Sequence, residues 1–91
     1  MAKVEIYTKS WCPYSVLAKE LLDQKAVNYE EIDVTSNSVR ELEMINRSQR
    51  TSVPQIFVNG IHLGGSDDLV AAERDGSLDR LLCLPTAGEA A

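Results

Sequence analysis

The feature that most constrains the fold is a change of hydrophobic period near the start of the chain. Apolar and polar side chains alternate over residues 4–9, which predicts a β-strand. Pro13 suits a first helical turn, and apolar residues at helical spacing over residues 16–22 extend a predicted helix to about residue 25. Residues 27–34 predict a second strand. This order indicates a right-handed βαβ unit with parallel strands.

A polar stretch after the second strand introduces another expected helix. Ser36 or Asn37 is suited to cap it, because short polar side chains accept hydrogen bonds from the free N–H groups at a helix start. We expect four apolar side chains to supply the buried face of this helix: Val39, Leu42, Met44 and Ile45.

A hairpin and two short helices are expected in the second half of the chain. Asn59-Gly60 is the strongest short signal for a hairpin turn, and it separates apolar runs over residues 55–58 and 61–63. Acidic residues then suit the start of a helix over about residues 67–75, since the helix dipole favours negative charge there. A last helix is expected over about residues 77–82.

The element order β-α-β-α-β-β-α predicts one α/β domain with a four-stranded mixed sheet flanked by helices. By analogy this is the order of a thioredoxin-like fold. We assign the domain to residues 1–84 and expect residues 85–91, which are small and polar, to form a flexible C-terminal tail. A chain of 91 residues is long enough for one hydrophobic core.

Charge and hydropathy exclude several classes of function. The chain has 14 acidic against 9 basic side chains and a formal net charge of −5, which argues against a nucleic-acid-binding protein. No apolar run is long enough for a membrane span, and the N-terminus lacks the apolar region of a signal peptide. We therefore expect a cytoplasmic protein.

Cysteine usage indicates one reactive thiol. Cys12 lies at the predicted strand-to-helix junction, where free N–H groups, the helix dipole and the nearby Lys9 favour a thiolate. Such settings lower a cysteine pKa from about 8.5 to roughly 3.5–7.5. Cys83 is interpreted as a bystander, and two distant cysteines with one histidine do not form a zinc site.

Three segments together resemble the glutaredoxin family, and in particular its small bacterial class. They are Ser10-Trp11-Cys12-Pro13-Tyr14-Ser15, Arg50-Thr51-Ser52-Val53-Pro54-Gln55-Ile56 and Gly64-Gly65-Ser66-Asp67-Asp68-Leu69. Each is moderately specific alone, but all three in this order are highly specific, and the similarity extends from Val4 to Leu82. The resemblance implies a thiol–disulfide oxidoreductase that uses glutathione as co-substrate, without a metal.

The resemblance also implies roles for matching residues in the first two segments. Cys12 would be the attacking cysteine that carries the glutathionyl group, and Tyr14 would flank its sulfur and shape the groove. The Val53-Pro54 pair matches a family Val-Pro whose proline is cis, and X–Pro bonds are where cis peptides occur. The backbone of Val53 would then face Cys12 and pair with glutathione as a short added strand.

The third segment would hold the γ-glutamyl end of glutathione. N–H groups and the Ser66 hydroxyl would take its carboxylate, and Asp67 would take its ammonium, although Asp67 could also be a helix N-cap. Lys9 and Arg50 are candidates for the glycine carboxylate. The whole expected binding set is Lys9, Tyr14, Arg50, Thr51, Ser52, Val53, Pro54, Gly65, Ser66 and Asp67.

Ser15 is the departure that matters, because the common family motif is C-P-Y-C and a second cysteine would stand at this position. A serine hydroxyl cannot resolve a mixed disulfide, so Cys12 cannot form an intramolecular active-site disulfide. A one-cysteine route through a Cys12–glutathione intermediate remains. Ser15 is either natural or an introduced replacement of a resolving cysteine, and the same question applies to Ser66.

The resemblance also implies partners for the protein, and two other functions stay open. The resemblance implies glutathionylated or disulfide-bonded protein substrates, glutathione reductase as the indirect electron source, and a monomer. An alternative is a glutathione-ligated [2Fe–2S] dimer, which Pro13 and Tyr14 disfavour. A non-catalytic adaptor is a third reading. His62 is interpreted as a surface strand residue, and Trp11 and Phe57 as scaffold or groove wall.

Overall fold

A computed structural model describes residues 2–83 of the chain. Four strands and four helices follow one another in the predicted order, and α4 is the short last helix that was expected after α3. Their bounds are β1 (Val4–Thr8), α1 (Pro13–Gln24), β2 (Tyr29–Asp33), α2 (Ser38–Ser48), β3 (Gln55–Val58), β4 (Ile61–Gly64), α3 (Ser66–Arg74) and α4 (Ser77–Leu81). The predicted tail, residues 85–91, lies outside the described residues.

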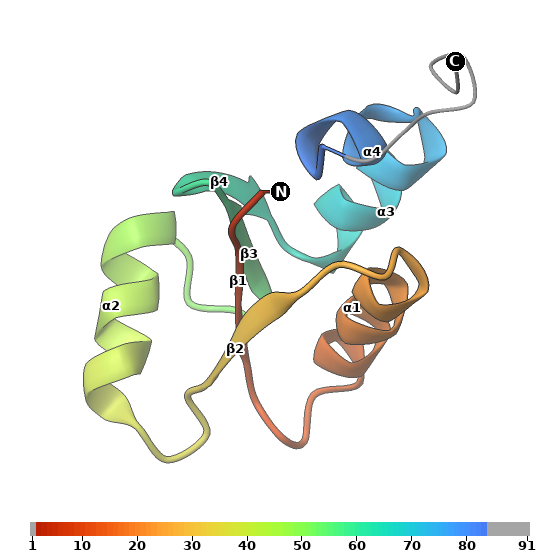
Figure 1. The fold of residues 1–91 in the computed structure, drawn as a ribbon. Helices are drawn as coiled ribbons and strands as arrows, with labels where there is room; N and C mark the ends of the chain where they lie inside the picture. Colours follow the sequence, from red (N-terminus) through yellow and green to blue (C-terminus); the bar gives the residue numbers. More distant parts are fainter. Residues whose placement is uncertain (1, 84–91) are drawn as a thin grey trace.

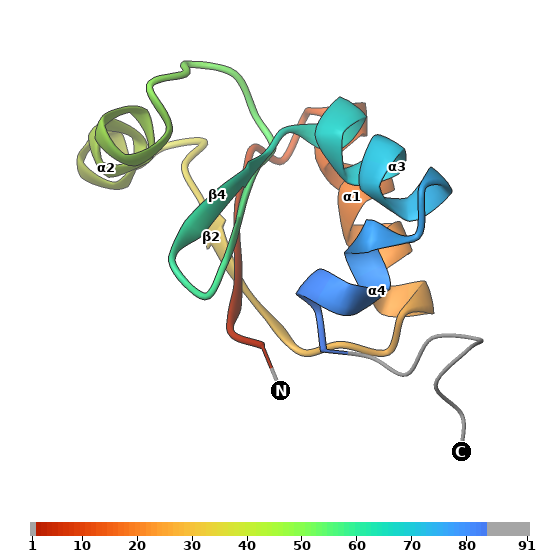
Figure 2. The same ribbon diagram turned by 90° about the horizontal axis from the view of Figure 1, so that it is seen from above.

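The four strands form one mixed sheet in the order β2-β1-β3-β4. β1 pairs with β2 in parallel, while β3 pairs antiparallel with both β1 and β4. Figures 1 and 2 show α2 on one face of the sheet and α1, α3 and α4 on the other. The predicted thioredoxin-like architecture, with a parallel βαβ unit followed by a hairpin, is thus confirmed.

The alternation of side chains along the strands builds a core on each face of the sheet. Val4 and Ile6 of β1 pack with residues of α1, α3 and α4, whereas Tyr7 packs on the opposite face toward α2. Ile56 and Phe57 of β3 divide between the faces in the same way. This arrangement fixes the carboxyl end of β1, and with it Cys12, against the segment that leads into β3.

The expected buried face of α2 is partly wrong. Met44 is fully buried and Ile45 packs against the core, but Val39 is 74% exposed and Leu42 is 59% exposed. The reason is the helical period: Met44 and Ser48 face the sheet, and at about 100° per residue Val39 and Leu42 lie on the opposite side of α2. Arg47 lies beside the buried stripe. Its guanidinium carbon lies 4.0 Å from the Phe57 ring centroid, and its side chain bonds to Glu5.

The start of α2 follows the prediction, because the Asn37 side chain caps it by accepting a hydrogen bond from Arg40 N at 3.1 Å.

The two aromatic residues that were predicted as scaffold or groove wall differ in exposure. Phe57 is buried, but Trp11 is 67% exposed and does not belong to the core. Among the described residues, no helix is both long and apolar enough to cross a membrane.

Candidate active site

Cys12 is the N-cap residue of α1, at the junction after β1. Its backbone is extended, Pro13 takes the first helical position, and the thiol is nearly buried, with 5% of the residue exposed. At this position a side chain lies beside the free N–H groups of the first helical turn. Those groups carry the positive end of the helix dipole.

The segment before β3 faces this thiol. The Cys12 Sγ lies 3.6 Å from the backbone oxygen of Val53, to which the thiol donates a hydrogen bond. The Val53-Pro54 peptide bond is cis, as expected. Pro54 is buried and Val53 is half-buried, so the backbone of Val53 forms the wall opposite the sulfur.

A polar chain that the sequence interpretation missed supports this wall. Gln55 is fully buried, and its amide donates to the backbone oxygen of Ser52 at 3.0 Å. The ring of His62 hydrogen-bonds to the Gln55 side-chain oxygen at 2.6 Å and packs against Phe57. The prediction for His62 is thus correct on the strand, β4, but wrong on the surface, because its side chain is half-buried and bonded to Gln55. Burial lowers its pKa, which favours the neutral ring as a donor to Gln55.

A groove of about 330 Å³ runs from this wall to the start of α3. Three segments that are far apart in the sequence meet there, namely the start of α1, the loop before β3 and the turn from β4 into α3. The groove contains most of the side chains that the sequence singled out, and Asp68 in addition. Its lining residues are Tyr14, Arg50, Ser52, Val53, Pro54, Gly65, Ser66, Asp67 and Asp68.

Asp68 has the capping role that was considered for Asp67. Gly65 is the N-cap of α3, and its N–H donates to the Asp68 carboxylate at 2.9 Å. Arg50 reaches the same carboxylate oxygen at 3.0 Å. The Gly65 N–H and then Arg50 hold the pKa of Asp68 below its ordinary value. Asp67 is exposed and lines the same groove.

Two members of the expected binding set are not lining residues of this groove. Thr51 is an exposed loop residue. Lys9 forms an ion pair with Glu41 of α2 at 2.8 Å, and its ammonium lies 5.5 Å from the Trp11 ring centroid. The acidic partner of Lys9 comes from a distant helix, so sequence spacing around Cys12 could not reveal it.

Ser15 lies one turn into α1 and is 1% exposed. Its hydroxyl has no hydrogen-bond partner among the residues that the structure describes. The position therefore accommodates a small side chain but does not satisfy a polar one. Cys83, the other cysteine, follows α4 and is exposed, and its role as a bystander stays a prediction.

Neither cysteine forms a disulfide. Within residues 2–83, no three histidine, cysteine, aspartate or glutamate side chains gather in a way that could hold a metal ion. These residues place a sulfur that can act as a nucleophile beside a mostly polar groove. Away from the sulfur, the groove is lined by Arg50, by free N–H groups at the start of α3 and by two carboxylates, those of Asp67 and Asp68.

The sequence and the structure of the chain both match known proteins of one family. The family model described as Glutaredoxin matches residues 4–63. Glutaredoxin 3 of Escherichia coli (strain K12) is 52% identical over 82 residues, which cover 90% of this chain and 99% of that protein.

Two solved structures share the fold. A solution structure of glutaredoxin from Brucella melitensis is 46% identical, has a TM-score of 0.80, and covers 90% of this chain and 89% of its own. The crystal structure of a buckwheat glutaredoxin–glutathione complex is 26% identical and has a TM-score of 0.83, covering 90% and 77% of the two chains.

Proposed function

The chain belongs to the glutaredoxin family and is a glutathione-dependent thiol–disulfide oxidoreductase; we propose that it reduces glutathionyl mixed disulfides by a one-cysteine route. The observation that carries this proposal is the groove that starts beside Cys12, at Val53, and ends at the N-terminus of α3. A thiol at one end of a groove sized for a short peptide suits a glutathionyl substrate.

The reaction has two thiol–disulfide exchanges. The Cys12 thiolate attacks the glutathionyl sulfur of a mixed disulfide, a Cys12–glutathione disulfide forms, and the substrate thiolate leaves and takes up a proton. The thiolate of a second glutathione then attacks the glutathionyl sulfur on Cys12, which releases glutathione disulfide and the Cys12 thiolate. Two glutathionyl groups thus leave as glutathione disulfide, and the substrate is reduced.

The groove offers a complementary group for each part of glutathione. We assign the backbone of Val53 to the central cysteine residue of glutathione, because it lies opposite the Cys12 sulfur. At the start of α3, the N–H groups and the Ser66 hydroxyl would bind the γ-glutamyl carboxylate, while Asp67 would bind its ammonium. The glutathione-bound buckwheat relative supports glutathione as the ligand.

Arg50 is the proposed partner of the glycine carboxylate, because its guanidinium lines the groove while it is held by Asp68. Lys9 could contribute only by sharing its ammonium with Glu41. Thr51 stays a prediction. The proposed partners are glutathionylated or disulfide-bonded proteins, with glutathione reductase regenerating glutathione, in a monomer in the cytoplasm.

The first test is the site of modification. After incubation with glutathione disulfide, mass spectrometry should find one glutathionyl group on Cys12, although Cys83 is the more exposed thiol. Cys12→Ser should abolish reduction of a small glutathione mixed disulfide in an assay coupled to glutathione reductase, while the matched control Cys83→Ser should keep it. Activity that survives in Cys12→Ser would contradict the mechanism.

The second test concerns Ser15. Because Ser15 occupies the resolving position of the common motif, Ser15→Cys should add reduction of protein disulfides by a two-cysteine route. If that activity does not appear, position 15 is not a resolving position in this chain. Visible absorbance after anaerobic purification separately tests the alternative, a [2Fe–2S] dimer.

A further inference from the structure

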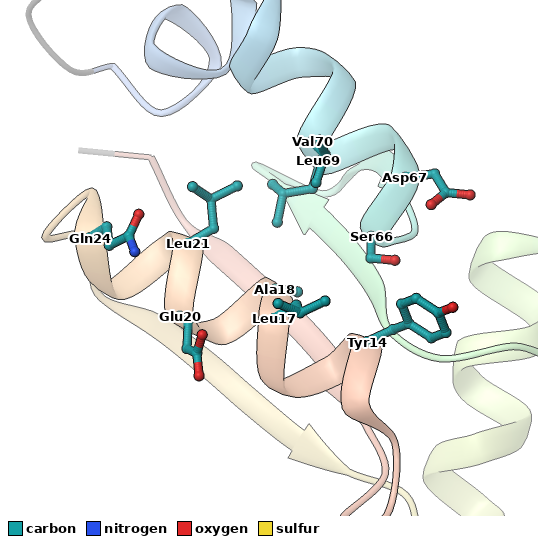
Figure 3. A pocket seen from close by; sticks show the side chains of 10 residues that line it. All are labelled: Tyr14, Leu17, Ala18, Glu20, Leu21, Gln24, Ser66, Asp67, Leu69 and Val70. Carbon is teal, nitrogen blue, oxygen red and sulfur yellow. The ribbon is translucent and has the colours of Figure 1, made fainter.

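A second hollow, the α1–α3 groove, lies between α1 and α3 and has a volume of about 320 Å³ (Figure 3). Its walls are mostly apolar. Leu17 and Leu21 extend from α1, and Leu69 and Val70 from α3, with Ala18 between the two helices. Leu17 is 56% exposed and Val70 is 41% exposed, so apolar area that could be buried remains accessible to water.

This groove adjoins the candidate glutathione groove. Tyr14, Ser66 and Asp67 line both, so an occupant of one touches the border of the other. Tyr14 is 57% exposed and stands at the end of α1 nearest to Cys12. A chain attached to the sulfur of a bound glutathionyl group can therefore leave the active site along the α1–α3 groove.

The length of the groove sets the reach of such a chain. From Tyr14 to Leu21 the rise along α1 is about 10 Å, at 1.5 Å per residue. An extended polypeptide covers that distance in about three residues. The apolar walls would thus meet a side chain about three residues away from the cysteine that carries glutathione.

The charged residues that line the α1–α3 groove favour some possible ligands over others. Glu20 and Asp67 line the groove, and neither forms an ion pair within residues 2–83. Asp67 is already assigned to the ammonium of the bound glutathionyl group, so Glu20 is the carboxylate that remains to favour a basic partner, on a chain of net charge −5. The same charges disfavour a second copy of this acidic chain. Residues 84–91 contain one glutamate and no lysine or arginine, so the tail is not complementary either.

We propose that the α1–α3 groove docks the polypeptide of a glutathionylated protein, through a bulky apolar side chain about three residues from the modified cysteine with a lysine or arginine beside it. The inference rests on the proposed function, because the docked segment is the leaving thiol of the first exchange. It adds a preference among protein substrates, and it leaves small glutathione mixed disulfides unaffected.

The experiment compares four glutathionylated peptides of equal length with a small reference substrate. Each peptide carries either leucine or serine three residues from the cysteine, at both the N-terminal and the C-terminal side. Each of these two peptides is made with either lysine or glutamate next to the leucine or serine, which gives four peptides. The reference is the mixed disulfide of glutathione and 2-mercaptoethanol, which is too short to enter the α1–α3 groove. The measured quantity is kcat/KM in the assay coupled to glutathione reductase.

The test variant is Leu17→Ser combined with Val70→Ser, and the matched control is Val39→Ser, which removes an even more exposed apolar side chain from α2. Wild type should prefer the leucine–lysine peptide to the serine–glutamate peptide by about tenfold. The double variant should no longer distinguish the leucine peptides from the serine peptides, while it keeps the preference for lysine and full activity on the reference substrate. The control should behave as wild type.

Charge reversal provides an independent arm. Glu20→Lys should shift the preference from the lysine to the glutamate peptide by several fold and should leave the reference substrate unchanged. An unchanged ranking of the lysine and glutamate peptides would contradict the assignment of a basic partner.

Each remaining result has a distinct meaning. If wild type reduces all peptides equally but reduces the reference substrate normally, the docking proposal is wrong and the proposed function stands. If the reference substrate is not reduced at all, the proposed function itself fails. A rise in KM for glutathione in the double variant, equal for every disulfide, would mean that the groove binds the reducing glutathione, and this would overturn the docking proposal.

Discussion

At the scale of single residues, two buried serines show opposite energetic roles. The Ser48 hydroxyl accepts from Arg50 N at 3.0 Å and donates to Arg50 O at 3.1 Å, and so holds the loop that carries Arg50. Ser15 is even more deeply buried, but its hydroxyl has no partner among the described residues. A buried polar group without a hydrogen-bond partner lowers the stability of the fold, whereas a hydrogen-bonded one raises it.

This contrast gives a prediction on stability. Ser15→Ala should leave the free energy of unfolding unchanged or raise it by up to about 1 kcal/mol, because an unsatisfied hydroxyl is removed. The matched control Ser48→Ala should lower it by about 1–2 kcal/mol. Urea denaturation of both variants measures the difference. A loss of more than about 1 kcal/mol in Ser15→Ala would mean that its hydroxyl is satisfied in solution.

The Asp68 carboxylate gives a prediction on pH dependence. Its pKa is lowered in the folded chain by the Gly65 N–H and Arg50, so ionisation of Asp68 stabilises the fold. This contribution is complete above the ordinary aspartate pKa of about 3.9 and is lost as the pH falls through the lower folded pKa. Asp68→Asn should therefore be less stable than wild type at pH 7, and the difference should shrink below about pH 4.

Chemical denaturation of wild type and Asp68→Asn across this pH range tests the assignment. The two proteins should converge in stability at the acid end, because both then carry an uncharged side chain at position 68. A constant gap over the whole range would show that the asparagine disturbs packing and that the charge of Asp68 contributes nothing.

At the scale of secondary structure elements, the turn from β4 into α3 depends on a glycine. Gly64 has a φ of +130°, and a Cβ there would lie 2.1 Å from the Asp68 carboxylate oxygen. Only glycine adopts such a backbone readily and also leaves room for the carboxylate to cap α3. The end of the candidate groove at the start of α3 therefore depends on this junction.

Gly64→Ala should accordingly destabilise the fold by about 1–3 kcal/mol and weaken the binding of glutathione. The matched control is Gly60→Ala in the hairpin turn. Its φ is +80°, but nothing lies within 4 Å of an added Cβ, so it should cost less and leave binding intact. Thermal or urea denaturation and a glutathione titration measure both effects. Equal losses in the two variants would show that contact with Asp68 is unimportant.

At the scale of the whole molecule, the negative charge acts against an anionic co-substrate. The chain has a net charge of −5 and a radius of gyration of 13.1 Å. The Debye length is about 30 Å at 0.01 M salt and about 8 Å at 0.15 M. At low salt a glutathione anion therefore experiences the repulsion of the whole chain, and at physiological salt it experiences mainly the groove and Arg50.

We expect kcat/KM for glutathione to rise by about twofold between 0.01 and 0.15 M salt, since screening removes the long-range repulsion. The neutral thiol 2-mercaptoethanol, used in place of glutathione, should show little change and is the control. Steady-state kinetics at fixed pH measure both. A fall in kcat/KM for glutathione would indicate that the cations near the groove dominate the field along the approach.

Much of the fold could be predicted from the sequence, because the signals are local. The period of two in β1, Pro13 at the start of α1, Asn37 before α2 and the Asn59-Gly60 turn each act over a few neighbouring residues. The placement of Cys12 at a helix start follows from the same local rules. The family motifs added most of the residues that line the groove, but they also added Lys9 and Thr51, which do not line it, and they missed Asp68.

Other features depend on which residues meet across the fold, and no local signal predicts them. Arg47 of α2 stacks on Phe57 of β3, and Lys9 finds its partner Glu41 on a helix far along the chain. The sequence by itself determined the element order and the thiol at the start of α1, because short-range backbone preferences decide those. Only the tertiary structure decided which groups surround that thiol, because burial and ion pairs arise where distant segments pack together.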